Sequence, residues 1–162
     1  MKQQSQLKTD QSFLERGGAW VVVQAILMLG VLGLALEFHC KRRSLGLLIA
    51  GTVCIGAGAA IGIAGALALR KSLTPFPKPL PNAHLVRNGI YSQIRHPLYT
   101  SVILGLVGWA MIRQSWPAIL MACGLIPFFV AKARHEEGFL CDRFPEYADY
   151  SKSTKRFFPR VY

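Results

Sequence analysis

Long uncharged apolar runs alternate with short polar segments along the chain. Residues 17–38 contain only Gln24 and, near their end, Glu37 as strongly polar side chains, and residues 45–69 form 25 positions without a charge. The hydrocarbon core of a bilayer is ~30 Å thick and needs about 20 helical residues. Each run therefore predicts a membrane-spanning helix. Sixteen mostly polar residues precede the first run, which is longer than the apolar part of a signal peptide, so we expect a retained anchor.

Two shorter runs in the second half of the chain predict a helical hairpin. Residues 98–112 and 115–131 contain 15 and 17 uncharged positions, and only Arg113 and Gln114 separate them. Each arm is slightly short for a full crossing, but both outer ends must lie on the same side of the membrane. The pattern thus predicts an all-α integral membrane protein with about four transmembrane helices, the last two forming the hairpin.

The second run is rich in glycine and alanine. Gly58 and Gly62 form a small-x-x-x-small pair, a spacing that lets two helix backbones approach closely. We therefore expect this helix to pack tightly against another one.

Composition agrees with a membrane protein. Of the 162 residues, 52% are apolar and 17% are charged, which excludes a disordered chain and argues against a soluble globule. Four scattered cysteines, none in a Cys-x-x-Cys pair, exclude a disulfide scaffold.

The basic residues are distributed unevenly around the predicted helices. The chain has 19 Lys and Arg against 8 Asp and Glu, a formal charge of +11. With four spans, 15 of the cations fall in the amino-terminal segment, residues 70–97 and the carboxyl tail, and four fall on the other side. The positive-inside rule therefore predicts that both termini face the cytoplasm. Topology and anionic lipid headgroups account for this charge, so we expect no nucleic-acid partner.

The polar segment before the hairpin is rich in proline. Alternating prolines at residues 75–81 favour an extended backbone, which we interpret as a stiff connector along the membrane surface. Asn88-Gly89 then marks a turn. Polar groups thus gather at the membrane boundary.

Two adjacent carboxylates, Glu136 and Glu137, follow the hairpin among cations. Neighbouring helix positions point about 100° apart, so the two side chains cannot face one ligand in the same way. We expect one to bind a ligand while the other supports it. The alternative is a solvated helix exit, in which Lys132 pairs with Glu136 four residues later.

Common catalytic motifs are missing from the sequence. His135 lacks the second His of a His-Glu-x-x-His helix, and the other histidines have no ligand spacing, so no metal site is expected. A Gly-x-Gly-x-x-Gly loop, a Walker loop and a Gly-x-Ser-x-Gly elbow are also missing. The chemistry must therefore come from residues beside the membrane.

An ordered set of short motifs in residues 70–162 resembles a known family. The set comprises Gly89-Ile90-Tyr91, Arg95-His96-Pro97-Leu98-Tyr99, the hairpin, Arg134-x-Glu136-Glu137, Phe144-x-Glu146-Tyr147-x-x-Tyr150, Arg156 and Pro159. In this order and spacing it is similar to the isoprenylcysteine carboxyl methyltransferase family, and the phospholipid N-methyltransferases are similar in the same half. Ser101 and Ile90 depart from the family pattern, which usually has Gly and often has Pro at these positions.

The resemblance implies an organisation and a reaction. It divides the chain into amino-terminal membrane helices, residues 1–69, and a methyltransferase core, residues 70–162, with a proline-rich loop, the hairpin and a short cytoplasmic helical tail. It implies S-adenosylmethionine in a pocket formed by the hairpin, the loop before it and the tail. A lipophilic substrate would enter this pocket from the bilayer, which we expect to be a bacterial inner membrane.

The resemblance also implies roles for particular residues. The cofactor-binding residues would be Gly89, Tyr91, His96, Pro97, Tyr99, Glu136 and Glu137. Either glutamate can accept hydrogen bonds from both ribose hydroxyls, and the two tyrosines can offer aromatic faces to adenine or to the sulfonium. Arg134 and Arg95 are the candidate catalytic residues, because either can orient an acceptor carboxylate through two hydrogen bonds.

Three alternatives stay open at this point. A phospholipid N-methyltransferase would methylate an amine instead of a carboxylate. A membrane reductase of the steroid-reductase type, which uses NADPH, also carries an Arg-His-Pro-x-Tyr segment, but typically with Asn before the Tyr, where this chain has Leu98. A non-catalytic membrane protein would bind no cofactor.

Overall fold

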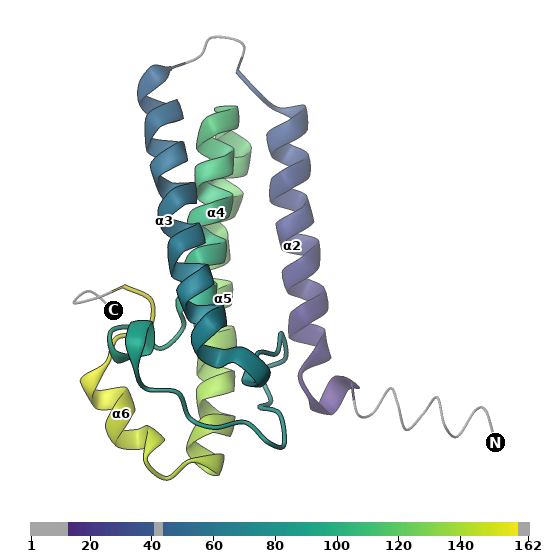
Figure 1. The fold of residues 1–162 in the computed structure, drawn as a ribbon. Helices are drawn as coiled ribbons and strands as arrows, with labels where there is room; N and C mark the ends of the chain where they lie inside the picture. The colour runs from purple at the N-terminus through teal and green to yellow at the C-terminus, as the bar shows by residue number, and fades with distance from the viewer. Residues whose placement is uncertain (1–12, 41–43, 159–162) are drawn as a thin grey trace, which may run out of the picture.

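The protein is a bundle of long helices with a small polar region at one end (Figure 1). Its computed structural model describes residues 13–40 and 44–158. The helices are α2 (Gly18–Glu37), α3 (Leu45–Leu69), α4 (Pro97–Arg113), α5 (Trp116–Arg143) and the short α6 (Tyr147–Ser153). Within the described residues the chain forms no strand, and β-structure is limited to one parallel bridge between Ile94 and Lys155. The predicted all-α fold is confirmed.

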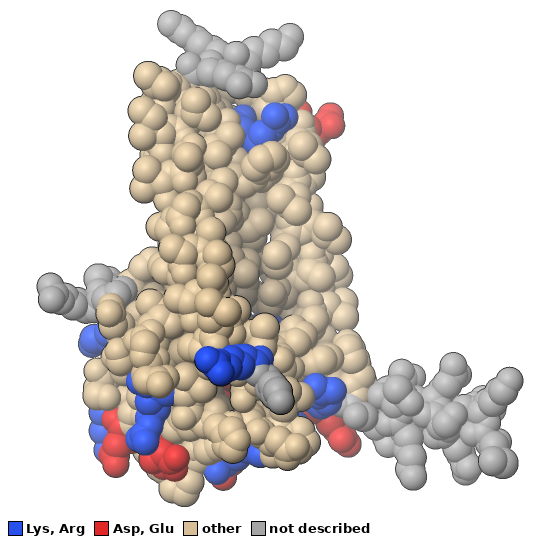
Figure 2. Space-filling view, viewed as in Figure 1, with Lys and Arg blue, Asp and Glu red and all other residues tan. Residues whose placement is uncertain are grey.

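The four long helices run alternately up and down. The start of α2, the connection from α3 to α4, the end of α5 and all of α6 lie at the same end (Figure 1). By length and composition α2, α3 and α5 can each cross a membrane, and α4 is a shorter apolar helix of 17 residues. Figure 2 shows charged side chains at the two ends and a broad uncharged band between them. The protein is thus built as an integral membrane protein.

The predicted hairpin is formed by α4 and α5. Gln114, with a left-handed backbone (φ 55°), makes the turn, and Ser115 caps α5 by accepting a hydrogen bond from the N–H of Ala118. The Gln114 side chain also bonds to both the N–H and the C=O of Ser44, at 2.9 and 3.1 Å. This turn is therefore fastened to the start of α3.

The second arm of the hairpin is a longer helix than its uncharged run. The uncharged run ends at residue 131, but α5 continues to Arg143. Its 28 residues span about 42 Å, so the helix extends beyond a hydrocarbon core by roughly 12 Å. Counting uncharged positions ends the helix too early, because the charged residues that follow find partners in the fold. Glu136 and Glu137 consequently lie on a regular helix.

Glycines form the contact between α3 and α4. A Cβ atom on Gly51 would lie 2.6 Å from the carbonyl oxygen of Gly108, and one on Gly58 would lie 3.0 Å from that of Ser101. A Cβ atom on Gly62 would lie 2.9 Å from the Ser101 hydroxyl. The predicted tight packing is confirmed, and Ser101 fits there because a glycine faces it.

The alternative reading of Lys132, as part of a solvated helix exit, is wrong. Lys132 is only 1% exposed. Its ammonium donates to Oε1 of Gln24 on α2 at 2.6 Å and to the carbonyl oxygen of Pro75 at 3.2 Å. It forms no ion pair with Glu136 among the described residues. Lys132 instead joins α2, α5 and the proline-rich connector.

Candidate active site

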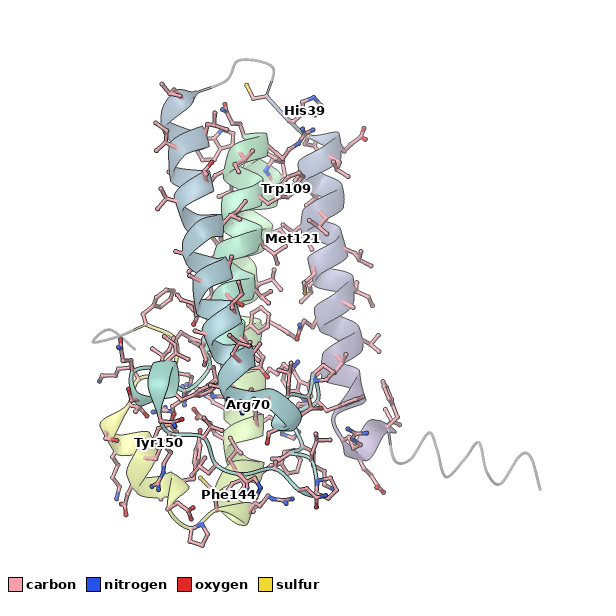
Figure 3. All side chains as sticks on the ribbon, viewed as in Figure 1. His39, Arg70, Trp109, Met121, Phe144 and Tyr150 are labelled. Carbon is pink, nitrogen blue, oxygen red and sulfur yellow. The ribbon has the colours of Figure 1, made fainter. Side chains whose placement is uncertain are left out.

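A cavity lies at the polar end of the bundle, between the proline-rich connector, the start of α4, the end of α5 and α6. It encloses about 790 Å³ of empty space, including its open mouth. Phe144 and Tyr150, which belong to its wall, lie at this end in Figure 3. Its wall is mostly apolar with a few polar side chains, a composition typical of small-molecule sites.

The proline-rich connector, besides joining α3 to α4, is a wall of this cavity. Phe76, Pro77 and Pro79 line it. The Arg16 guanidinium lies 4.2 Å from the centre of the Phe76 ring. Together with the hydrogen bond from Lys132 to Pro75, this contact holds an irregular segment in place.

The segment before α4 is shaped by a glycine and by the carboxyl tail. Gly89 has a left-handed backbone (φ 60°) and begins a 3₁₀ turn that buries Tyr91. The tail then runs alongside, since the N–H of Arg95 donates to Lys155 O at 2.8 Å and the N–H of His96 to Arg156 O at 3.0 Å. Pro97 follows at the first position of α4, where its missing N–H costs little.

Glu137 is the centre of an ion-pair network behind the cavity. Its Oε1 accepts a hydrogen bond from Arg95 Nε at 3.0 Å, and its carboxylate accepts two from Arg156, Nε at 3.1 Å and Nη2 at 2.6 Å. His96 Nε2 lies 3.2 Å from the same Oε1. The network joins α5, the start of α4 and the tail.

Glu136 faces a different way, toward the cavity. Its Oε2 accepts a hydrogen bond from the Tyr99 hydroxyl at 2.6 Å and lies 3.7 Å from His96 Nδ1. The His96 and Tyr99 rings stack in parallel, with their centres 5.2 Å apart. The Glu136 side chain is 26% exposed, against 13% for Glu137. The two carboxylates are thus separated in the manner that their adjacent helix positions predicted, although this does not test which of them binds a ligand.

The structure brings most of the predicted site residues to the cavity. Those that line it are Tyr91, Arg95, His96, Tyr99 and Glu136. Glu137 contacts two of them from behind, and Gly89 and Pro97 shape the backbone that carries them. Arg134 is exposed on α5 and is not among the lining residues.

Three residues that shape the site were not among the predicted site residues. Arg156 binds Glu137, Tyr147 lines the cavity from α6, and buried Lys132 holds the connector. Arg156 and Tyr147 belong to the motif set, which was a usable signal. Nothing in the local sequence marks Lys132, because its partners are 57 and 108 residues away in the chain.

Three tyrosines around the cavity stay neutral at physiological pH. Burial, with Glu136 adding to it, holds the pKa of Tyr91 well above its usual value. Burial, with Glu137 adding to it, does the same to the pKa of Tyr147. Burial raises the pKa of Tyr150 to about 12. Each phenol is therefore a hydrogen-bond donor.

A family model described as phospholipid methyltransferase matches residues 47–146, more than half of the chain. The protein belongs to the phospholipid methyltransferase family. The match includes every predicted site residue and most of the cavity wall. The family consists of membrane methyltransferases, so the broader assignment made from the motifs is confirmed. The match does not distinguish the isoprenylcysteine carboxyl methyltransferases within this wider group.

Two relatives of this phospholipid methyltransferase family member carry names from metal resistance. The chain is 38% identical over 81 residues to the cobalt-zinc-cadmium resistance protein CzcN of Cupriavidus metallidurans, covering 49% of this chain and 38% of CzcN. It is 29% identical over 153 residues to the nickel-cobalt-cadmium resistance protein NccN of Alcaligenes xylosoxydans xylosoxydans, covering 93% of this chain and 68% of NccN.

Proposed function

We propose that the protein transfers a methyl group from S-adenosylmethionine to a lipophilic acceptor at the membrane boundary. One observation carries the proposal: the cavity that gathers Glu136, Tyr99 and Arg95 opens where apolar helices end, with Leu69 and Leu98 also in its wall. A molecule held there can keep its apolar part among the helices and its reactive group beside the polar residues. A water-soluble acceptor would not need this placement.

The residues present fit such a cofactor. The Glu136 carboxylate can accept hydrogen bonds from hydroxyls, and the rings of Tyr91 and Tyr99 offer aromatic faces. The buried Tyr147 hydroxyl has no hydrogen-bond partner among the described residues, which leaves a donor for a ligand. When bound, S-adenosylmethionine supplies an activated methyl group. We propose that Glu136, His96, Tyr91 and Tyr99 hold it, with Glu137 supporting His96.

Because the cofactor supplies the activated methyl group, the protein mainly positions the acceptor beside it and excludes water. A carboxylate acceptor is already ionised and needs only a cation to orient it, the role that we propose for Arg134 or for Arg95, which lines the cavity. An amine acceptor must lose a proton. Glu136 and His96 are then the groups in the cavity wall that can take it.

Ligand binding by the detergent-purified protein tests the cofactor assignment. We expect S-adenosylhomocysteine to bind and NADPH not to bind. Glu136→Gln should weaken S-adenosylhomocysteine roughly 10-fold or more, because a hydrogen bond to a charged group is lost. Glu146→Gln, at an exposed carboxylate outside the cavity wall, is the matched control. Binding of NADPH in place of S-adenosylhomocysteine would favour the reductase, and binding of neither would favour a non-catalytic protein.

The acceptor has two candidates. The motif resemblance favours an isoprenylcysteine-type carboxylate, and the family match favours an aminophospholipid. Methyl-labelled cofactor, incubated with the protein and separate lipid and aqueous cell extracts, distinguishes them. Base-labile label in the lipid phase indicates a methyl ester, and base-stable label indicates a methylated amine. Label confined to water-soluble products would contradict the lipophilic acceptor.

A role in metal resistance, as the relatives' names describe, does not require this chain to bind a metal. Within residues 13–40 and 44–158, no three His, Cys, Asp or Glu side chains lie close enough together to hold a metal ion. We propose that a contribution to metal resistance comes from methylation of a membrane component.

We propose that the methyltransferase core includes α3 in addition to residues 70–162. The family match begins at residue 47, the glycines of α3 pack directly on α4, and Leu69 lines the cavity. The remaining helix, α2, then serves as a membrane anchor that contacts the core through Gln24.

We propose that the protein lies in a bacterial inner membrane and that its cavity opens on the cytoplasmic side. Of the 15 cations counted on one side in the sequence, those within the described residues belong to segments at the cavity end. Reporter fusions after residues 42 and 113 should then report an external location, and a fusion at the carboxyl terminus a cytoplasmic one. An external carboxyl terminus would overturn this orientation.

A further inference from the structure

One buried hydrogen-bond donor in the cavity wall, the Tyr147 hydroxyl, has no acceptor in the part of the chain that the structure describes. Arg95, in the same wall, donates to protein acceptors through Nε and Nη1. Buried polar groups in folded proteins nearly always have partners. A buried donor without an acceptor, in a wall that also carries a guanidinium, indicates a ligand group that accepts hydrogen bonds.

The Tyr147 hydroxyl is isolated although its ring is firmly packed. The residue is 2% exposed, and its ring contacts the Tyr150 ring edge to face at 5.6 Å. The Tyr150 hydroxyl, on the next turn of the same short helix, donates to the carbonyl oxygen of Tyr91 at 2.6 Å. The neighbouring phenols therefore differ in one respect: Tyr150 has a structural partner and Tyr147 has none among the described residues.

Arg95 is fixed by its other nitrogens. Its Nε donates to Glu137, and its Nη1 donates to the carbonyl oxygens of Ser151, at 2.6 Å, and of Thr154. Because the guanidinium is planar and rigid, these bonds also fix the direction of Nη2. Nη2 of Arg95 is thus a donor held in a fixed direction on a residue of the cavity wall.

We propose that Tyr147 and Arg95 together bind the carboxylate of the amino-acid end of the cofactor. A carboxylate can accept several hydrogen bonds and carries the charge that suits a guanidinium. Glu136, as an ionised acceptor, suits the opposite kind of group, such as the ribose hydroxyls. This inference rests on the proposed function, since it assigns one end of the proposed cofactor to one side of the cavity. Arg95 is then engaged by the cofactor, which leaves Arg134 to orient an acceptor carboxylate.

The test compares two ligands on three proteins. S-adenosylhomocysteine contains the carboxylate, and methylthioadenosine keeps the nucleoside and thioether but lacks the amino-acid end. Tyr147→Phe should weaken S-adenosylhomocysteine about 10-fold and change methylthioadenosine less than about twofold. Its thermal midpoint without ligand should be unchanged or raised, because no protein hydrogen bond is lost. Tyr150→Phe should lower the midpoint, since it loses the bond to Tyr91.

Other results overturn the inference. If Tyr147→Phe weakens both ligands equally or neither of them, its hydroxyl does not bind the carboxylate. If it lowers the thermal midpoint as much as Tyr150→Phe does, the hydroxyl has a structural partner and the premise is wrong. Failure of the unaltered protein to bind S-adenosylhomocysteine is a separate result, which overturns the proposed function and this inference with it.

Discussion

The pairing of Glu137 with Arg156 should contribute measurably to stability, because it fastens the carboxyl tail to α5. Two hydrogen bonds join the side chains, at 2.6 and 3.1 Å, and the arginine and glutamate are 16% and 13% exposed. A pair this well covered is little screened by water. We therefore propose a double-mutant cycle with Glu137→Gln, Arg156→Met and the double variant.

The expected loss in the free energy of unfolding depends on which charged groups each variant leaves without a partner. Arg156→Met removes one partner, but Glu137 keeps Arg95 and His96, so we expect a loss of about 2 kcal/mol in the free energy of unfolding. Glu137→Gln leaves two arginines facing a neutral amide. We expect a loss of about 3–4 kcal/mol there, as for other half-broken buried pairs. The coupling energy between the two sites should be about 2 kcal/mol.

Equilibrium unfolding in mixed detergent micelles, followed by helix content, gives the three free-energy differences. Lys152→Met is the control, because it breaks the exposed pair with Asp149 and should leave stability unchanged within error. A coupling energy below about 0.5 kcal/mol would mean that the two residues act independently. An Arg156→Met variant that loses more stability than Glu137→Gln would show that the tail, and not the carboxylate, organises the network.

Two further predictions concern the packing of the helices. Gly51→Ala should lower the free energy of unfolding by about 1–3 kcal/mol, because the new Cβ would lie 2.6 Å from Gly108 O. Gly56→Ala is the control and should not lower it, because its Cβ would meet nothing within 4 Å. Thermal midpoints in detergent measure both variants. Gln24→Leu should destabilise the protein more than Gln24→Leu combined with Lys132→Met, because the single change leaves a buried ammonium with one acceptor fewer. Equal midpoints for single and double variants would contradict a charged Lys132.

The lipid-facing helices could be predicted from the sequence almost to the residue. The run at 17–38 became α2, Gly18–Glu37, and the run at 45–69 became α3, Leu45–Leu69. A bilayer forces this agreement, because a segment that crosses it must be apolar and must satisfy its own backbone. The end of α5 lies outside that constraint. There the helix continues because Glu137 and nearby charged residues are paired with residues far along the chain. The local sequence does not reveal those pairs.

The sequence predicted most of the polar residues that gather at the cavity, but not how they are arranged there. Helical geometry correctly separated Glu136 from Glu137, but it could not say which of them faces the cavity. That choice depends on Arg156, which is 19 residues further along the chain and reaches Glu137 only because the tail lies beside Arg95 and His96. The same tail and α6 bring Tyr147 to the cavity. Its isolated hydroxyl is a property of the assembled structure that no spacing in the sequence contains.

The bilayer and the polar hydrogen bonds fix different parts of the bundle. The apolar helices are fixed by lipid and by the glycine contact of α3 with α4, and neither depends on what is methylated. The cavity wall is fixed by a few polar contacts at one end, chiefly those of Glu137, Lys132 and the tail. A change in the lining residues of the connector or of α6 alters the cavity without disturbing the helices. Under the proposed function, we therefore expect the choice of acceptor to depend on these short segments and not on the membrane helices.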